Sequence, residues 1–144
     1  MDLFTIGYEG MTIDGFVRNL LLGKVDIVAD VRLNPISRKP FFSKKSLARA
    51  LEGHGISYVH LRELGTPRDM RTTVMQTGDY EKFMHEYRGF LTTRLHELEE
   101  LLLLVRSKNV ALMCFEKDPD KCHRSAVAMA VKELDGNGLR IRSI

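Results

Sequence analysis

Three adjacent residues, Cys122, His123 and Arg124, form the densest cluster of reactive side chains in this sequence. They stand at the start of a predicted helix, where the free N–H groups and partial positive charge favour the thiolate form of a cysteine. The adjacent arginine acts in the same direction, so Cys122 could be a nucleophile with His123 as its acid or base. The alternative is that Cys122 is inert and that its two neighbours only cap the helix.

A second cysteine, Cys114, lies eight positions earlier within the apolar run Val110–Phe115, where a cysteine is most often a small buried hydrophobe. Together with Glu116, Cys122 and His123 it could also ligate a metal ion. The spacing C-x-E-x5-C-H matches no recognised zinc motif, so we predict no metal site. We expect the protein in a reducing cytoplasm, with both thiols free.

Carboxylates stand at three predicted strand ends, at Glu9, Asp30 and Glu116. Each is a candidate general base or nucleophile, because a carboxylate among arginines stays ionised, whereas burial would raise its pKa. The candidate catalytic residues are therefore these three carboxylates with Cys122 and His123, and Cys114 is the alternative thiol.

Basic and hydroxyl side chains near the same strand ends could hold an anion. The stretch from Arg32 to Arg49 contains six basic residues and no acidic one. Arginine offers a bidentate fork to phosphate, and two prolines stiffen this stretch, although a solvated basic loop is the alternative. The candidate substrate-binding residues are Tyr8, Arg32, Ser37, Arg38 and Arg124.

The elements that position these residues alternate between strand and helix. Strands are predicted at Leu3–Tyr8, Val25–Val31, Ile56–Leu61 and Val110–Phe115, with an edge strand at Leu139–Ile144. Helices are predicted after Thr12 as far as Gly23, from Ser43 to about Glu52, from Asp79 to about Lys108, and over Ser125–Leu134. A break or kink is expected in the third of these helices at Gly89. The last helix is expected to end at Gly136-Asn137-Gly138. The segment Arg62–Gly78 is predicted to be a long functional or mobile loop.

This order predicts one α/β domain over residues 1–144, with three layers and a mostly parallel sheet of four to five strands covered by helices on both faces. In such sheets, ligands bind outside the carboxyl ends of the strands. The candidate residues collect at these ends, so the fold prediction is also a site prediction.

The same residues resemble an uncharacterised family, catalogued as domain of unknown function 488. The similarity runs through Thr5–Gly10, Asp30-Val31-Arg32 with Pro35, Ser37-Arg38 and Pro40, His60-Leu61 with Leu64-Gly65, Met113–Glu116, and Cys122-His123-Arg124. The family has no settled activity, and the resemblance implies a small cytoplasmic α/β domain of prokaryotes whose motif positions include the candidate residues. A weaker similarity in layout is to rhodanese-type sulfurtransferases, but nine residues separate Cys114 from Arg124 where those enzymes have a short loop, so we infer no sulfur transfer.

Composition limits the function classes. The chain has 144 residues, 44% hydrophobic and 28% charged, with a net charge of +3, which is too mild to indicate nucleic-acid binding by itself. We see no signal peptide and no apolar run long enough for a membrane span. Three functions stay open: an enzyme acting on a phosphate-bearing or nucleotide-type substrate, a nucleic-acid-binding or regulatory module, and a thiol-dependent enzyme. The cofactor, the reaction and the oligomeric state are left undetermined.

Overall fold

A five-stranded sheet forms the centre of the protein, and all of its strand pairs are parallel. The computed structural model describes residues 1–136 and 138–144. The strands are β1 (Asp2–Gly7), β2 (Ile27–Asp30), β3 (Ser57–His60), β4 (Val110–Cys114) and β5 (Arg140–Ser143), in the spatial order β3-β2-β4-β1-β5. The predicted edge strand is therefore confirmed as β5, which pairs only with β1 among the described residues.

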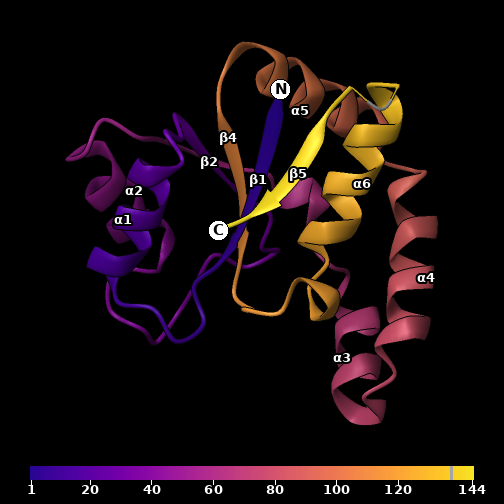
Figure 1. The fold of residues 1–144 in the computed structure, drawn as a ribbon. Helices are drawn as coiled ribbons and strands as arrows, with labels where there is room; N and C mark the ends of the chain where they lie inside the picture. Colours follow the sequence, from indigo (N-terminus) through magenta and orange to yellow (C-terminus); the bar gives the residue numbers. More distant parts are fainter. Residues whose placement is uncertain (137) are drawn as a thin grey trace.

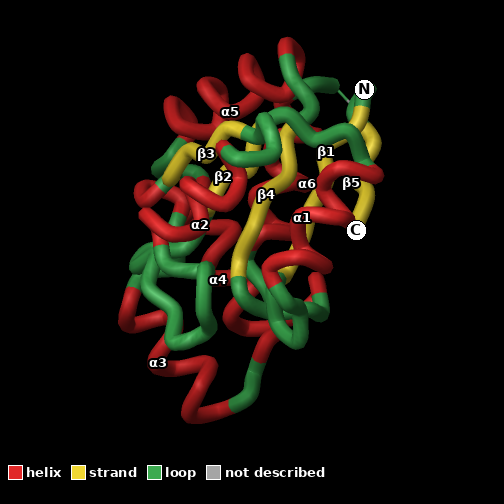
Figure 2. The backbone as a smooth tube through the Cα atoms, turned by 90° about the vertical axis from the view of Figure 1, so that its left-hand side faces the viewer, coloured by secondary structure: helices red, strands yellow, loops and turns green. Residues whose placement is uncertain are grey.

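Helices cover both faces of this sheet, which confirms the predicted three-layer α/β fold (Figure 1). One face carries α1 (Ile13–Leu22) and α2 (Lys44–Glu52), and the other carries α4 (Tyr80–Leu91), α5 (Leu95–Ser107) and α6 (Arg124–Leu134). A further helix, α3 (Arg68–Thr77), lies beyond the carboxyl ends of the strands, at the bottom of Figure 2. Two short 3₁₀ helices, η1 (Arg62–Leu64) and η2 (Pro119–Lys121), lie in loops at the same ends.

The apolar core is divided into two layers by the sheet. All five residues of β4 are buried, and its pleat sends Leu112 toward α5 and α6 and Met113 toward α1 and α2. A strand buried on both faces needs a continuous apolar run, which is why the sequence shows this pattern in β4. The central position of β4 places its last residue, Cys114, in the middle of the carboxyl edge of the sheet.

The predicted signals at the ends of α1 are confirmed. The side chain of Thr12 accepts a hydrogen bond from the Gly15 N–H at 3.1 Å, and the helix ends at Gly23. Ser43 precedes α2 as predicted but does not cap it with its side chain, because its hydroxyl oxygen accepts from the Ser37 N–H at 3.0 Å instead and its proton goes to the Ser37 carbonyl. These bonds tie the loop after β2 to the start of α2.

Two predictions about the middle of the chain are wrong. The segment Arg62–Gly78 is not a structureless loop, since it contains η1 and α3, and α3 buries only Val74 among its ten residues. A helix with one buried position shows only a weak apolar stripe, so periodicity gave little sign of it. The single long helix is two helices, and the break falls at Thr92–Arg94 rather than at Gly89, because the hydroxyls of Thr92 and Thr93 bond carbonyls of the last turn.

The predicted stop at Gly136-Asn137-Gly138 includes Asn137, which lies outside the described residues, while Gly136 has a φ of 74°. Within the described part of the chain, no helix combines the length and the apolar character needed to cross a membrane.

Candidate active site

A cleft of about 410 Å³ lies at the carboxyl edge of the sheet. Its floor is built from strand ends, with Tyr8 after β1, Arg32 after β2 and Cys114 at the end of β4. Residues of α3 and the start of α4 form its outer wall. The cleft therefore lies where a parallel α/β sheet is expected to bind ligands.

A buried ion pair forms the support of this floor. Asp30 is fully buried at the end of β2, and its carboxylate accepts hydrogen bonds from Arg32 Nε at 2.9 Å and from Arg32 Nη2 at 2.7 Å. The Tyr58 hydroxyl donates to the same carboxylate at 2.5 Å. The remaining guanidinium nitrogen of Arg32 donates to the Tyr8 hydroxyl at 3.1 Å and to the Phe42 carbonyl at 2.8 Å. Asp30 therefore holds Arg32 in place, and both of its oxygens are occupied by protein donors.

The electrostatics of this pair follow from burial and mutual attraction. Although burial opposes it, the hydrogen bonds and charge of Asp30 raise the pKa of Arg32 above its ordinary value. Burial, together with the hydrogen bond to Asp30, raises the pKa of Tyr58. Arg32 thus stays charged and Tyr58 stays protonated over the whole physiological range.

Two histidines bind the backbone of the loop after β2. His60 Nε2 lies 2.7 Å from the Arg32 carbonyl oxygen, and His123 Nε2 lies 2.6 Å from the Val31 carbonyl oxygen. A carbonyl oxygen can only accept, so both Nε2 atoms donate. Burial lowers the pKa of His123 to about 4, so its ring is neutral and its Nδ1 carries a lone pair.

The two cysteines are bonded to each other in this structure. A disulfide joins Cys114, at the end of β4, to Cys122, two residues before α6, and both residues are 1% exposed. The prediction that both thiols are free is therefore wrong. The sequence separation of eight residues gave no sign of the contact, because the loop through η2 folds back and returns the chain to the same strand end.

Arg124 lies directly beneath the disulfide and is 1% exposed. Its Nη1 donates to Cys114 Sγ at 3.1 Å and to the Glu116 carbonyl, and its Nη2 donates to the Lys117 carbonyl at 3.1 Å. Among the described residues, its Nε is the only buried side-chain nitrogen or oxygen without a hydrogen-bond partner. Burial lowers the pKa of this guanidinium. Arg124 thus places positive charge at a sulfur atom and orders the loop after β4.

Close backbone contacts at this edge require glycine at two positions. A Cβ on Gly7 would lie 1.8 Å from the Glu116 carbonyl oxygen, and one on Gly65 would lie 2.5 Å from Leu33 Cα. Because Gly7 has no Cβ, the loop after β4 can pass directly over the end of β1 at Glu116. The glycine of the Gly7-Tyr8 pair is therefore needed to bring Tyr8 and Arg124 to the same edge.

Residues 12–131 match the family model described as Domain of unknown function DUF488. The chain belongs to this family. No curated protein and no solved structure matches the chain. The matched range contains the ion pair, the disulfide and Arg124, whereas Tyr8 and Glu9 precede it.

The structure of this DUF488 member gathers some of the predicted site residues and separates others. Tyr8, Arg32, Ser37, Glu116 and His123 line the cleft. Asp30, Cys122 and Arg124 are buried behind it. Glu9 is exposed and accepts a hydrogen bond from the Lys117 N–H at 2.9 Å, and Arg38 is exposed.

Of the three arginines that we expected to clamp an anion, only Arg32 lines the cleft. Arg32 reaches Tyr8 and Phe42 in the layer of α1 and α2, whereas Arg124 reaches Cys114 in the layer of α6. The guanidinium groups approach the edge from opposite faces and bond mainly to protein atoms. An anion in the cleft would therefore need other cations.

Sequence reasoning missed the cleft residues on its outer wall. Thr66, Arg71, Tyr80 and Lys121 line the cleft, and the last three are exposed. Thr66 and Arg71 belong to the segment that we expected to be a long functional or mobile loop. The pair of apolar residues Met70 and Val74, spaced as on one helix face, was the available signal for α3.

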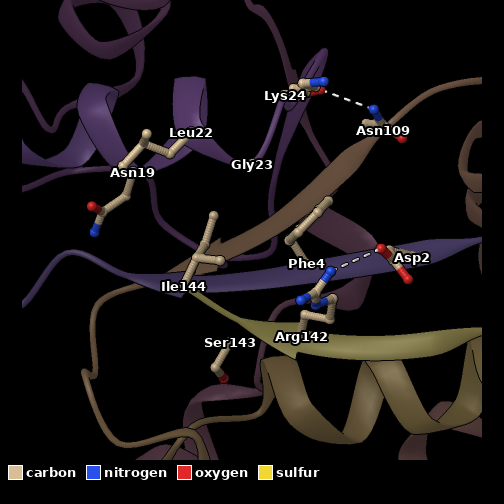
Figure 3. A pocket seen from close by; sticks show the side chains of 10 residues that line it. All are labelled: Asp2, Phe4, Asn19, Leu22, Gly23, Lys24, Asn109, Arg142, Ser143 and Ile144. Atoms are coloured by element: carbon tan, nitrogen blue, oxygen red, sulfur yellow. Dashed lines mark hydrogen bonds and ion pairs between the residues drawn. The ribbon is translucent and has the colours of Figure 1, made fainter.

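A second hollow, of about 560 Å³, lies beside the edge strand β5 and the end of α1 (Figure 3). Its charged residues are Asp2, Lys24 and Arg142. Asp2 is already paired with Arg142 at 3.3 Å, and the Lys24 carbonyl accepts from Asn109 at 2.9 Å. This hollow has no nucleophile of the kind found at the carboxyl edge, so the strand-end cleft is the better candidate site.

Proposed function

We propose that this protein is a dithiol oxidoreductase that reduces a small anionic substrate held in the strand-end cleft. The observation that carries this proposal is the disulfide between Cys122 and Cys114, of which Cys114 lines the cleft, with Arg124 Nη1 3.1 Å from Cys114 Sγ. A positive guanidinium beside a sulfur favours the thiolate, which is the reactive form. The disulfide is the oxidised end of the cycle.

The cycle needs a dithiol reductant, which transfers two electrons and two protons to the disulfide and becomes a disulfide itself. The Cys114 thiolate then attacks one atom of an oxidised S–S, S–O or O–O bond in the substrate, and the other fragment leaves with the electron pair and takes a proton. The Cys122 thiolate next attacks Cys114 Sγ, which restores the disulfide and releases the first fragment with its proton. The Cys122 proton passes to the released fragment; the neutral His123 ring, whose Nδ1 lies 3.9 Å from Cys122 Sγ, can accept a hydrogen bond from that thiol.

The side chains around the cleft favour a small anion as the substrate. Arg71 and Lys121 are exposed cations on its wall, Thr66 and Ser37 add hydroxyls, and Glu116 is the one acidic residue among its lining residues. The volume of about 410 Å³ lies in the range of small-molecule sites, which is about 300–1,000 Å³. A phosphate-bearing or nucleotide-type compound that carries an oxidised bond fits this description.

We place the protein in the cytoplasm as part of this proposal. Disulfides there are usually transient and catalytic, because the compartment supplies dithiol reductants. A pair that cycles between dithiol and disulfide suits this environment.

The first test measures alkylation of each cysteine in the reduced, metal-free protein over a range of pH, with mass spectrometry to identify the modified residue. We expect Cys114 to reach its half-maximal rate below about pH 8.5, the value for an ordinary cysteine. The variant Cys122→Ser tests Cys114 alone, and Cys114→Ser tests Cys122 alone. Ordinary behaviour of both thiols, or no reaction at either, would overturn the proposal.

The second test compares iodoacetate, which is anionic, with the neutral iodoacetamide. A cationic cleft should raise the ratio of the two rates at Cys114 by about tenfold over that of a free thiol at low salt. The variants Arg71→Ala and Lys121→Ala should each lower this ratio, whereas Arg88→Ala, which removes an exposed charge on α4 outside this cleft, should not. An unchanged ratio in both cleft variants would reject the anionic substrate.

A further inference from the structure

We propose that the reduced protein binds one Zn²⁺-like metal ion through Cys114 Sγ, Cys122 Sγ and His123 Nδ1. This inference concerns metal binding by the dithiol form and does not depend on the proposed reductase activity. Two thiolates and an imidazole are the ligands that zinc prefers, and the same donor set occurs in zinc enzymes.

The donor atoms are already close together in the fold. One ligand atom from each of Cys114, Cys122 and His123 lies within 4.8 Å of the others. Around one tetrahedral zinc ion, such donors are about 3.5–3.8 Å apart. The Cα atoms of the two cysteines are 7.2 Å apart, so after reduction their side chains can place the two sulfurs at this spacing.

The orientation of the histidine ring suits a metal ligand. His123 Nε2 donates to the Val31 carbonyl at 2.6 Å, so the lone pair lies on Nδ1, on the side of Cys122 Sγ. Ligating histidines almost always donate their other ring N–H to a carbonyl or carboxylate in this way. The ring of Tyr87 packs edge-to-face against the imidazole at 5.3 Å and holds its plane. This support is in place without any ion.

The charges around the cluster allow a divalent cation. Two thiolates supply two negative charges, which balance the ion. Arg124 and Arg71 add positive charge near His123, and the carboxylates of Glu116 and Asp118 lie near Arg124 and offset it. The Arg124 hydrogen bond to Cys114 Sγ stabilises a thiolate ligand without displacing it.

The fourth coordination position would open to the cleft. Both Cys114 and His123 line the cleft, while Cys122 lies behind them. Three protein ligands with one open position is the arrangement of catalytic zinc sites, whereas structural sites use four. Glu116, the fourth member of the cluster considered in the sequence, is not part of this donor group.

The metal and the disulfide exclude each other, because both use the same sulfur electrons. A small-molecule disulfide would oxidise the two thiolates, forming the Cys114–Cys122 bond and two small-molecule thiolates and releasing the ion. Metal binding would in turn protect both thiols from alkylation. Oxidation state therefore decides whether the metal is held.

The experiment uses Co²⁺ as a spectroscopic probe and then Zn²⁺, both added anaerobically to the reduced protein after the reductant has been removed. We expect one Co²⁺ per chain, with a thiolate-to-cobalt charge-transfer band and the intense visible bands of tetrahedral cobalt, both abolished by Zn²⁺. The disulfide form should show neither band. X-ray absorption of the zinc-loaded protein should show two sulfur ligands at about 2.3 Å and lighter ligands at about 2.0–2.1 Å.

Variants identify the ligands. Cys114→Ser, Cys122→Ser and His123→Asn should each weaken zinc binding by more than about tenfold, whereas His85→Asn, an exposed histidine of α4, should leave it unchanged. If a ligand variant does not fold, the absorption spectrum of the wild-type protein decides the question. Absence of the charge-transfer band, or fewer than two sulfur ligands, would overturn the site. The alkylation assays use metal-free protein, so failure of either proposal is recognised independently.

Discussion

Replacement of Asp30 by asparagine should destabilise the protein far more than the nearly equal size of the two side chains suggests. In the native protein the fully buried carboxylate receives bonds from Arg32 and from the Tyr58 hydroxyl. The substituted amide would keep one acceptor oxygen and turn its NH₂ group toward donors. Arg32, 6% exposed, would keep its charge without a counter-charge, and its remaining acceptors would be the Tyr8 hydroxyl, the Phe42 carbonyl and at most the one amide oxygen.

The expected loss is about 3–5 kcal/mol, the usual cost of leaving one member of a buried pair without its counter-charge. Domains of this kind have a total free energy of unfolding of about 5–15 kcal/mol, so the variant should remain folded but marginal. Urea unfolding followed by circular dichroism measures the difference, with the wild-type slope expected to be retained. The control is Glu86→Gln, which breaks the exposed Lys82–Glu86 pair at 3.9 Å and should cost less than about 0.5 kcal/mol.

A second substitution separates charge from shape. Adding Arg32→Met to Asp30→Asn removes the unpaired charge, and the double variant should recover at least about 1.5 kcal/mol relative to the single one. The reasoning is refuted if Asp30→Asn costs no more than Glu86→Gln. It is equally refuted if the double variant is less stable than the single variant.

Three other predictions follow from the same edge of the sheet. Gly7→Ala should cost more than about 3 kcal/mol in urea unfolding, because its Cβ would lie 1.8 Å from the Glu116 carbonyl oxygen, whereas Gly89→Ala, with open space around it in α4, should stabilise by about 0.5–1 kcal/mol. In the disulfide form, the pKa of His123 is about 4, below the value of 6.5 in the unfolded chain. The neutral ring therefore contributes to the free energy of unfolding above pH 6.5, and this contribution is lost as the pH falls toward 4. Between pH 6.5 and 5 the wild type should lose stability faster than His123→Gln, and parallel slopes would contradict this. Reduction of the disulfide should lower the free energy of unfolding by about 2–3 kcal/mol in metal-free protein, because the closed loop no longer restricts the unfolded chain. Zn²⁺ should restore part of this stability. An unchanged free energy of unfolding after reduction would contradict this reasoning.

Much of the fold was predictable because its signals are local. The apolar runs of β1, β2 and β4 and the capping residue Thr12 each report on a few neighbouring residues. Alternation of strands and helices then leads to a parallel sheet by connection rules alone. By contrast, α3 was hard to recognise because only one of its residues, Val74, is buried. The break between α4 and α5 depends on threonine hydroxyls rather than on glycine.

The candidate site was predictable in position but not in its connections. The rule that ligands bind at the carboxyl ends of parallel strands led to the edge where Tyr8, Arg32 and His123 line the cleft. Residue type did not reveal the contacts of each side chain, since Asp30 is paired with Arg32 and Arg38 is exposed outside the cleft lining. Whether an ionisable group is available depends on its neighbours in space, and spacing along the chain does not contain that information.

By itself the sequence determined which segments form the sheet and which residue types reach its carboxyl edge, because pleat and helix periods are properties of short segments. The tertiary structure alone decided that Cys114 and Cys122 meet, that Arg124 lies beneath them and that His123 turns its Nδ1 toward them. These contacts depend on the loop after β4 crossing the end of β1 over Gly7 and returning to α6. Such a path is set by packing between distant segments, which no local pattern encodes.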